Sequence, residues 1–477
     1  MDDIVNTILN IPEETQTIEF KRLAGDKVVR KILQTIVAMA NTDGGTIILG
    51  VDDPEKTALK GCDRIFGVEE DKVLLDEILK EQSKINPQLQ GIQFRHIKAQ
   101  GDKTIVLITV EKSKESLVSL SNDVFTRLNK SNKKLNPQEI VKWSYTKGFI
   151  KADKELVDVD FELLQTKYFD VWCGAMGISG GTIQSILSQA GLAKKGQEEI
   201  LRPTRAAVLL FAEHPTYLME IHCTVRVIQL RGTLERFETV PNYVSKPKTI
   251  GGPIIEVIRN SHEYVLSLLG AGIEIHSGFV NTFKIPERAV KEAITNAVIH
   301  RDYRIQRDVE IRVFEDRVEV LSPGLFTYNI TANNIGFVRA DGERNDLLVK
   351  HLREFPNPPN LNFNEGVRAM RAEMDKQNLY PPIFMTYPTY PDSVNVILLN
   401  EERPTEWEKV RLYLSRNRYI DNKTARNITG VVQMHDMSRM LKRWTEQGFL
   451  VKIDAESKYF KGTKYKLANI DEMGIEQ

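Results

Sequence analysis

The stretch DKVVRKILQTIVAMANTDGGTIILGV constrains the fold most, because a helix, a tight turn and a strand follow one another directly. Over residues 26–41 apolar side chains recur on one helical face: Val29, Ile32, Leu33, Ile36, Val37 and Ala40. Residues 42–45, TDGG, predict a turn, and the β-branched run 46–51 predicts a buried strand. Residues 17–21, TIEFK, alternate apolar and polar side chains as a half-buried strand does. We therefore predict a mixed α/β domain over residues 1–150.

A second α/β domain is predicted over residues 160–402. Residues 287–301 have the spacing of an amphipathic helix, and residues 308–324 read as two alternating strands. Residues 354–364, EFPNPPNLNFN, predict a loop because proline and asparagine interrupt regular structure. Residues 394–400 supply a last strand.

The third predicted domain, residues 403–470, has the order helix, helix, helix, hairpin of a winged helix-turn-helix. Residues 404–467 hold 14 Lys/Arg against 7 Asp/Glu, a local net charge of +7. We expect a recognition helix at 434–447. The basic candidates for nucleic-acid contact are Arg439, Lys442, Arg443, Lys461 and Lys464. Dimerisation or partner docking is the alternative use of such a domain.

Composition excludes several classes. The chain of 477 residues balances 65 basic against 65 acidic side chains, so any basic surface must be local. The longest apolar run, residues 206–212, is far below the ~20 residues that a membrane span needs. Three scattered cysteines argue against a disulfide framework or zinc cluster, and the N-terminus lacks the pattern of a secretory signal. We expect an α/β (α+β) multidomain protein of the cytoplasm, without membrane association.

The segments IEFKR (18–22), AMANTDGGTIILGVDD (38–53) and FTRLNKSNKK (125–134) together resemble the Schlafen AlbA-type domain, over about residues 10–150. The resemblance implies a small mixed α/β domain associated with nucleic acid. Some Schlafen proteins are metal-dependent endoribonucleases that cut tRNA-like substrates. Their acidic site corresponds here to Glu14, Glu19 and Asp52.

Converging carboxylates suit that chemistry, because Mg²⁺ or Mn²⁺ prefers oxygen ligands and polarises a phosphodiester for attack by water. Glu14, Glu19 and Asp52 would hold the cation, and Lys21 beside them would hold the scissile phosphate. The alternative is structural. Glu14 would then be a surface or helix-capping acid, and Glu19 an ion-pair partner.

The segment 125–134 contributes a second set of candidates. We expect Arg127, Lys130, Lys133 and Lys134 to form an exposed basic loop that contacts phosphates. A solvated polar loop is an equal alternative. For the turn 42–45 the structural interpretation, in which two glycines permit the chain reversal, is favoured over phosphate binding.

The run ERAVKEAITNAVIHRDY resembles the N-box helix of the GHKL ATPase (Bergerat) fold, over about residues 285–400. Glu292 and Asn296 match the family's base and magnesium-ligand positions, and their four-residue spacing puts both on one helical face. Two departures follow. The family's adenine-contacting DxGxG is replaced by LSPGL at 321–325, and the glycine-rich lid is reduced to NEGV at 364–367. We predict a degenerate ATP pocket that is structural or binds nucleotide weakly, without hydrolysis.

Two functions stay open at this point. One is a Schlafen-like, metal-dependent endonuclease that hydrolyses RNA (tRNA-like) or single-stranded DNA, plausible in phage defence. The other is a non-catalytic DNA-binding transcriptional regulator with a ligand- or nucleotide-sensing central domain. The carboxylates favour the first by a small margin. In both we expect a homodimer or higher homo-oligomer, because the resemblance implies two AlbA-type lobes around a substrate and this chain supplies one.

Overall fold

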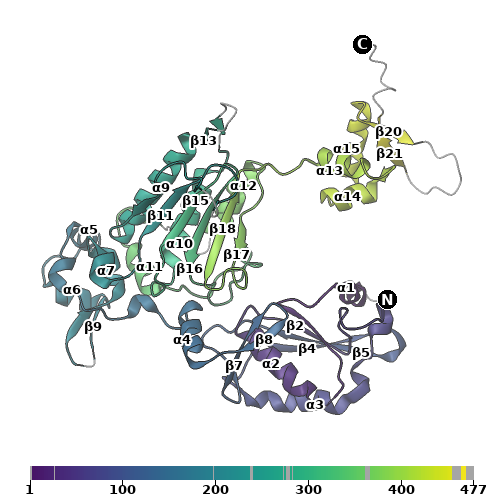
Figure 1. Ribbon diagram of the computed structural model, residues 1–477, viewed down its shortest axis with the longest axis horizontal. Coiled ribbons are helices and arrows are strands. Elements are labelled where there is room, and N and C mark those ends of the chain that lie inside the picture. The colour runs from purple at the N-terminus through teal and green to yellow at the C-terminus, as the bar shows by residue number, and fades with distance from the viewer. Residues whose placement is uncertain are drawn as a thin grey trace, which may run out of the picture. The chain divides into compact units, whose positions relative to one another are not determined.

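The structure is a computed structural model that describes residues 3–25, 27–196, 198–236, 240–271, 273–274, 280–281, 283–359, 366–453 and 463–468. It divides into two compact units, Met1–Glu401 and Glu402–Gln477 (Figure 1). The predicted third domain begins one residue after the second unit does. Within the described ranges no helix has the length and apolar character needed to cross a membrane.

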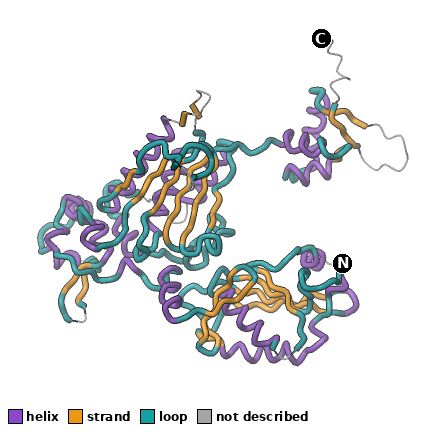
Figure 2. Tube along the Cα trace, in the orientation of Figure 1, coloured by secondary structure: helices purple, strands orange, loops and turns teal. Residues whose placement is uncertain are grey.

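The N-terminal domain mixes helices with two small sheets, as predicted (Figure 2). The first sheet has the order β1-β2-β5-β4: β1 (Ile18–Lys21), β2 (Gly45–Leu49), β5 (Thr104–Val110) and β4 (Ile92–Lys98). The second has the order β3-β6-β7-β8: β3 (Ile85–Asn86), β6 (Ser119–Leu120), β7 (Asp123–Leu128) and β8 (Ser131–Lys134). The helices are α1 (Asp3–Leu9), α2 (Val28–Ala40), α3 (Lys72–Glu81) and α4 (Pro137–Thr146).

Helix α2 forms the centre of this domain, because it packs against strands of both sheets. The apolar face predicted from the sequence is buried, and Ile32, Ile36 and Val37 are fully covered. The turn after α2 needs glycine. Gly44 has a φ of +74°, and a Cβ added to it would lie 2.7 Å from the carbonyl oxygen of Val110. The TDGG sequence therefore lets β2 run close beside β5.

The central domain is built on a six-stranded mixed sheet of order β12-β11-β15-β16-β18-β17. Its strands are β12 (Lys248–Ile250), β11 (Val225–Gln229), β15 (Val309–Val313), β16 (Arg317–Pro323), β18 (Ser393–Leu399) and β17 (Ile383–Met385). The helices near this sheet are α9 (Ile254–Ala271), α10 (Glu287–His300), α11 (Asp346–Leu352) and α12 (Gly366–Lys376). Helix α10, predicted from its periodicity, packs against β16 and against both α9 and α12.

A helical segment precedes this sheet in the chain. It contains α5 (Lys167–Ala175), α6 (Ile183–Gln189), α7 (Arg205–Phe211), α8 (Pro215–Met219) and the hairpin β9 (Ala193–Lys195) and β10 (Leu201–Pro203). The apolar run 206–212 lies in and just after α7 and is buried. One hydrophobic core joins this segment to the sheet and to α10.

The C-terminal unit contains α13 (Glu406–Leu414), α14 (Asn422–Thr429) and α15 (Met434–Glu446). A three-stranded sheet of order β19-β21-β20 completes it: β19 (Ile420–Asp421), β21 (Lys464–Leu467) and β20 (Leu450–Ile453). Met437, Leu441 and Trp444 of α15 are buried. The three helices and the strands β20 and β21 follow in the expected order, but the strand β19 between α13 and α14 was not predicted. The winged helix-turn-helix and its use in DNA binding stay predictions.

Candidate functional sites

Two of the predicted acidic residues meet around one lysine. Glu19 lies on β1, and both Glu19 and Glu14 are only 4% exposed. The Lys21 amino group lies 3.7 Å from Glu14 Oε1 and forms an ion pair with Glu19 Oε1. The backbone N–H of Phe20 donates to Glu14 Oε1 over 2.9 Å, which fixes this carboxylate against β1. The structure therefore brings Glu14, Glu19 and Lys21 together.

Asp52 is held in the fold through its backbone, and its role as a third metal ligand stays a prediction. It is half-buried, and its backbone rather than its carboxylate bonds to Arg64, whose guanidinium donates to the Asp52 carbonyl oxygen over 2.8 Å. The next residue, Asp53, is buried, and Lys56 Nζ lies 2.5 Å from Asp53 Oδ2 and 3.3 Å from Glu14 Oε2. The acid that this structure links to Glu14 is thus Asp53. Burial alternates along Val51, Asp52 and Asp53, and that alternation turns Asp53 inward.

The carboxylates of this cluster are already neutralised by basic side chains. Glu19 pairs with Lys21 and also with Arg127, while Lys56 joins Glu14 to Asp53. Burial acts to raise the pKa of Asp53, but hydrogen bonds from Lys56 and from the Glu55 N–H outweigh it and lower that pKa. The three buried acids Glu14, Glu19 and Asp53 are thus paired with three basic side chains: Lys21, Lys56 and Arg127.

Such an arrangement does not fit a divalent cation, which needs several free oxygen ligands at one point. Across the described parts of the chain, no three His, Cys, Asp or Glu side chains lie close enough together to hold a metal ion. A cation at Glu14 and Glu19 would have to displace Lys21 from between them.

The prediction of an exposed basic loop is wrong for Arg127. This residue lies in β7 and is 1% exposed, because four successive residues of that strand are covered. Its backbone N–H donates to Thr42 Oγ1 over 2.8 Å, and its guanidinium donates to the Thr15 carbonyl oxygen and pairs with Glu19. Arg127 is a structural partner of the buried acid.

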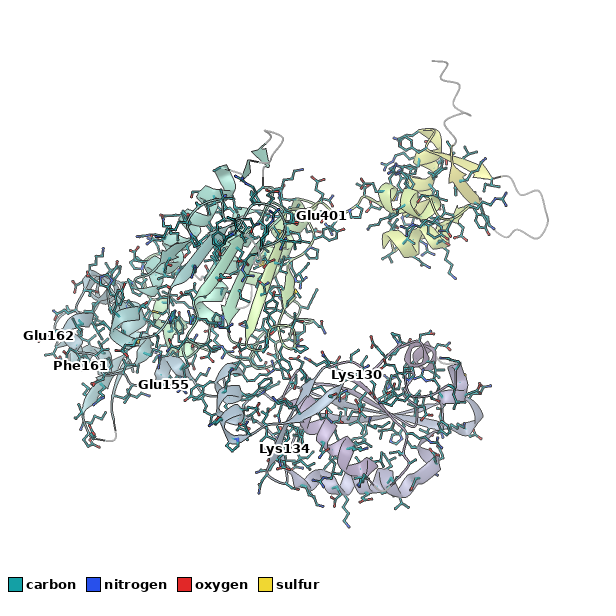
Figure 3. All side chains as sticks on the ribbon, viewed as in Figure 1. Lys130, Lys134, Glu155, Phe161, Glu162 and Glu401 are labelled. Atoms are coloured by element: carbon teal, nitrogen blue, oxygen red, sulfur yellow. The ribbon has the colours of Figure 1, made fainter. Side chains whose placement is uncertain are left out.

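The three lysines of the same hairpin are exposed, with Lys130 and Lys134 labelled in Figure 3. Each forms an ion pair of 2.7 Å with a nearby acid: Lys130 with Glu55, Lys133 with Glu139, and Lys134 with Asp123. Phosphate groups would compete with these carboxylates for the lysines. The hairpin is therefore a basic surface whose charge is partly neutralised.

The TDGG turn is partly buried. Thr42 is fully buried, and the buried side-chain amide of Asn41 donates to the carbonyl oxygens of Val118 and Phe125 over 2.8 Å each. The Asp43 carboxylate accepts from Gln16 Nε2 over 2.5 Å. These contacts support the structural interpretation of the turn.

The central domain contains an open cavity of about 450 Å³ beside α10. Glu292 and Asn296 line it, as do Ser322, Gly324 and Leu325 of the segment that replaces DxGxG. Gly366 at the start of α12 closes against the two helix residues, since a Cβ there would collide with the Glu292 carboxylate. Burial raises the pKa of Glu292, and the charge of Arg288 opposes that rise. The residues that replace DxGxG therefore alter the lining of the cavity but do not fill it.

Sequence reasoning missed two further residues of the cavity wall. Arg288 and His300 lie four residues before Glu292 and after Asn296, so α10 presents one cavity-facing row. The His300 side chain is exposed where it lines the cavity, yet the protein around it lowers its pKa to about 4, chiefly by desolvation and then through the charge of Arg344. The four-residue spacing was the signal that could have identified both residues.

The basic candidates on α15 are exposed at the surface of the C-terminal unit. Arg439 pairs with Asp436 at 2.6 Å, and Lys442 lies 3.7 Å from Glu446. Arg443 is also exposed. Lys464 of β21 lies 3.7 Å from the ring centre of Tyr419, and Lys461 falls outside the described residues.

Comparison with known families agrees with the resemblances read from the sequence. Residues 14–136 match the family described as "Schlafen, AlbA_2". Residues 306–398 match the family described as "Putative ATP-dependent DNA helicase recG C-terminal". A solved structure, the DIP2311 protein from Corynebacterium diphtheriae, is 14% identical over 95% of each chain, with a TM-score of 0.39.

The two matched regions define the class of protein, one with a function related to nucleic acid. The chain carries a Schlafen AlbA_2 domain, followed by an ATPase-like domain of the recG C-terminal type.

Proposed function

We propose that this protein is a nucleic-acid-binding regulator whose central cavity binds a nucleotide-like ligand. One observation supports this most. The acidic cluster of the AlbA_2 domain is closed by its own cations, whereas the cavity beside Glu292 and Asn296 is open. A binding function needs only the open cavity and exposed basic surfaces.

The ligand class follows from the size and lining of the cavity. A volume of about 450 Å³ lies within the ~300–1,000 Å³ typical of small-molecule sites. Asn296 offers an amide oxygen that would hold the magnesium ion of a bound nucleotide, and Glu292 presents a carboxylate from the same helical face. That ion would screen the charge of the phosphates. Because Leu321–Leu325 supplies no acid to contact an adenine base, we expect weak binding with little base preference.

Calorimetry with Mg²⁺-ATP tests the ligand. We expect binding that Asn296→Ala weakens about ten-fold, with phosphate release at the level of a protein-free control. The exposed Asn10→Ala is the matched control and should bind as the unaltered chain does. ATP turnover that Glu292→Ala eliminates would contradict the absence of hydrolysis, and unchanged binding by Asn296→Ala would contradict the site.

The nucleic-acid surfaces are proposed on two parts of the chain. The β7–β8 hairpin carries Lys130, Lys133 and Lys134, and α15 with β21 carries Arg439, Lys442, Arg443 and Lys464; Lys461 belongs to the same set by sequence. Basic side chains of this kind bind the phosphate backbone, and their contribution falls with salt. We expect duplex DNA to bind through the C-terminal unit, with an affinity that decreases steeply between 50 and 200 mM salt.

A metal-dependent nuclease is the second candidate. The observation that favours it is the buried pair Glu14 and Glu19, which face one lysine in a matched AlbA_2 domain. Mg²⁺ or Mn²⁺ would need Lys21 and Lys56 to move away and Asp52 or Asp53 to turn toward Glu14. Mn²⁺-dependent cutting of labelled tRNA or single-stranded DNA would favour this candidate over the regulator.

Self-association is part of either proposal. A single AlbA-type lobe offers one basic hairpin, and two-fold pairing is the commonest way to present two. We expect light scattering at micromolar concentration to give at least twice the monomer mass of 54.5 kDa. The monomer mass, measured with and without DNA, would contradict this expectation.

A further inference from the structure

The cavity of the central domain is bounded on one side by a long irregular segment. Residues 324–345 connect β16 to α11 and supply much of the lining. Phe326, Ile330 and Arg344 are among the residues that line the cavity. Segments of this kind can change conformation at lower cost than helices or strands, because fewer backbone hydrogen bonds have to break. We call this segment the wall of the cavity. The contacts that hold the wall in place therefore influence which ligands the cavity can bind.

Lys112 of the AlbA_2 domain forms hydrogen bonds to the backbone of this wall. Lys112 follows β5, is 7% exposed, and donates to the carbonyl oxygens of Phe326 (2.9 Å) and Ile330 (2.7 Å). Burial, together with the charge of Lys147, lowers the pKa of Lys112 well below its ordinary value. A buried amino group pays a large penalty when its acceptors leave, so the wall and Lys112 must move together.

Arg344 ties the same wall to α4, the helix that follows the AlbA_2 domain. Its guanidinium donates to the carbonyl oxygen of Tyr145 over 2.6 Å and to those of Thr146 and Leu325. The N–H of Leu325 donates in turn to the Thr146 carbonyl oxygen over 3.2 Å. Both ends of the wall thus depend on residues outside the central domain.

The contacts continue from α4 to the nucleic-acid hairpin. Lys147, one residue after α4, donates to the Thr42 carbonyl oxygen over 2.8 Å and lies 3.9 Å from Asp43 Oδ1. The hydroxyl of Thr42 accepts from the N–H of Arg127 in β7. The TDGG turn is therefore in direct contact with α4 on one side and with the β7–β8 hairpin on the other.

We propose that Lys112 couples the cavity to the β7–β8 hairpin, so that a ligand in the cavity changes the affinity of the AlbA_2 domain for nucleic acid. The inference rests on the proposed function. A ligand that moves Phe326 to Ile330 displaces both acceptors of Lys112. Lys112 also packs against the TDGG turn that supports the hairpin, since a Cβ added to Gly44 would lie 3.1 Å from the Lys112 backbone nitrogen. By thermodynamic linkage, nucleic acid then changes ligand affinity by the same factor.

The test measures both affinities in the full-length protein, with Mg²⁺-ATP and a labelled single-stranded RNA as probes. In the unaltered chain, saturating ATP should change RNA affinity at least five-fold, and RNA should change ATP affinity equally. Lys112→Met keeps the length and removes the donors, so the coupling should fall below two-fold while each single affinity stays within about three-fold. Lys114→Met is the matched control, because Lys114 pairs with Asp341 of the same wall at the surface, and it should retain the coupling.

The outcomes separate this inference from the proposed function. Failure of ATP and RNA to bind would overturn both, whereas binding of both without coupling, or full coupling in Lys112→Met, would overturn only the inference. If Lys112→Met does not fold, hydrogen exchange of the unaltered chain decides. RNA must then change the exchange of the Phe326–Ile330 amides, and unchanged exchange with RNA bound would overturn the coupling.

Discussion

The acidic cluster of the AlbA_2 domain and the cavity of the central domain differ in how their charges are satisfied. Glu14 and Glu19 are buried and each is paired with a basic side chain. Glu292 and Asn296 instead line open space, and the charge of Arg288 only opposes the rise in the pKa of Glu292. The acids of the first region are paired within the protein, whereas the second region leaves space beside Glu292 and Asn296.

This difference shows that a sequence motif can be present while its side chains are already engaged in ion pairs. The AlbA-type pattern is the better preserved of the two in sequence, yet its carboxylates are engaged by Lys21, Arg127 and Lys56. The ATPase-type pattern has lost its adenine acid, yet its cavity persists. Removing the basic partner of a buried carboxylate costs free energy of folding, so the ion pairs of the acidic cluster resist rearrangement.

Glu19→Gln gives the largest expected effect. The substitution leaves the buried guanidinium of Arg127 without its counter-charge, and breaking a buried pair typically costs about 3–5 kcal/mol. Urea unfolding should show this loss. Glu13→Gln, whose side chain is 57% exposed and lies 4.0 Å from Lys130, is the control and should change little. A loss below about 1 kcal/mol for Glu19→Gln would mean that the cluster is not a closed network.

The second prediction concerns acid and the helix that carries the cavity residues. His262 of α9 contacts the Lys291 carbonyl oxygen (3.1 Å) and Thr295 Oγ1 (3.0 Å) of α10, and burial lowers its pKa to about 4. The unfolded chain binds this proton below about pH 6.5, whereas the folded chain binds it only near pH 4. Stability is therefore fully present above pH 6.5 and falls as the pH drops toward 4, by up to about 3 kcal/mol.

His262→Gln removes that titration. Urea unfolding at pH 7 and at pH 4.5 should show a smaller difference for the variant than for the unaltered chain. An equal difference in both proteins would assign the acid sensitivity to other groups.

The third prediction fills the cavity. Ala297 lines it from α10 and is 5% exposed, so Ala297→Leu places extra methyl groups where the ligand would lie. We expect at least a ten-fold loss of ATP affinity by calorimetry, with a cooperative unfolding transition retained. Unchanged affinity would locate ATP elsewhere and remove the contrast between the two regions.

The smallest expected effect is at the hairpin. Lys133→Ala removes one exposed cation, so RNA affinity should fall two- to three-fold and the slope of log affinity against log salt should decrease by about one. Lys80→Ala, also exposed but on α3, should leave both values unchanged. An equal effect from both variants would indicate binding by overall charge rather than by the hairpin.

The sequence predicted elements better than it predicted side-chain environments. Periodicity located α2, α10 and α15 to within two residues, because an apolar face has to be buried wherever the chain folds. It placed Arg127 on the surface, because a basic residue in a polar run gives no sign that a buried acid lies across the domain. The inward side of Asp53 depended on an alternation of burial after β2 that the motif does not reveal. Lys112 was not identified, because its partners are backbone carbonyls more than 200 residues away.

Incubation of the purified protein with labelled tRNA, single-stranded DNA and duplex DNA, with and without Mn²⁺, tests the central claim most directly. The closed acidic cluster predicts complexes without cleavage in every lane, with the same affinity whether or not Mn²⁺ is present. Mn²⁺-dependent cleavage that Glu14→Gln abolishes, in a variant shown to be folded, would contradict the account and make the AlbA_2 domain a nuclease.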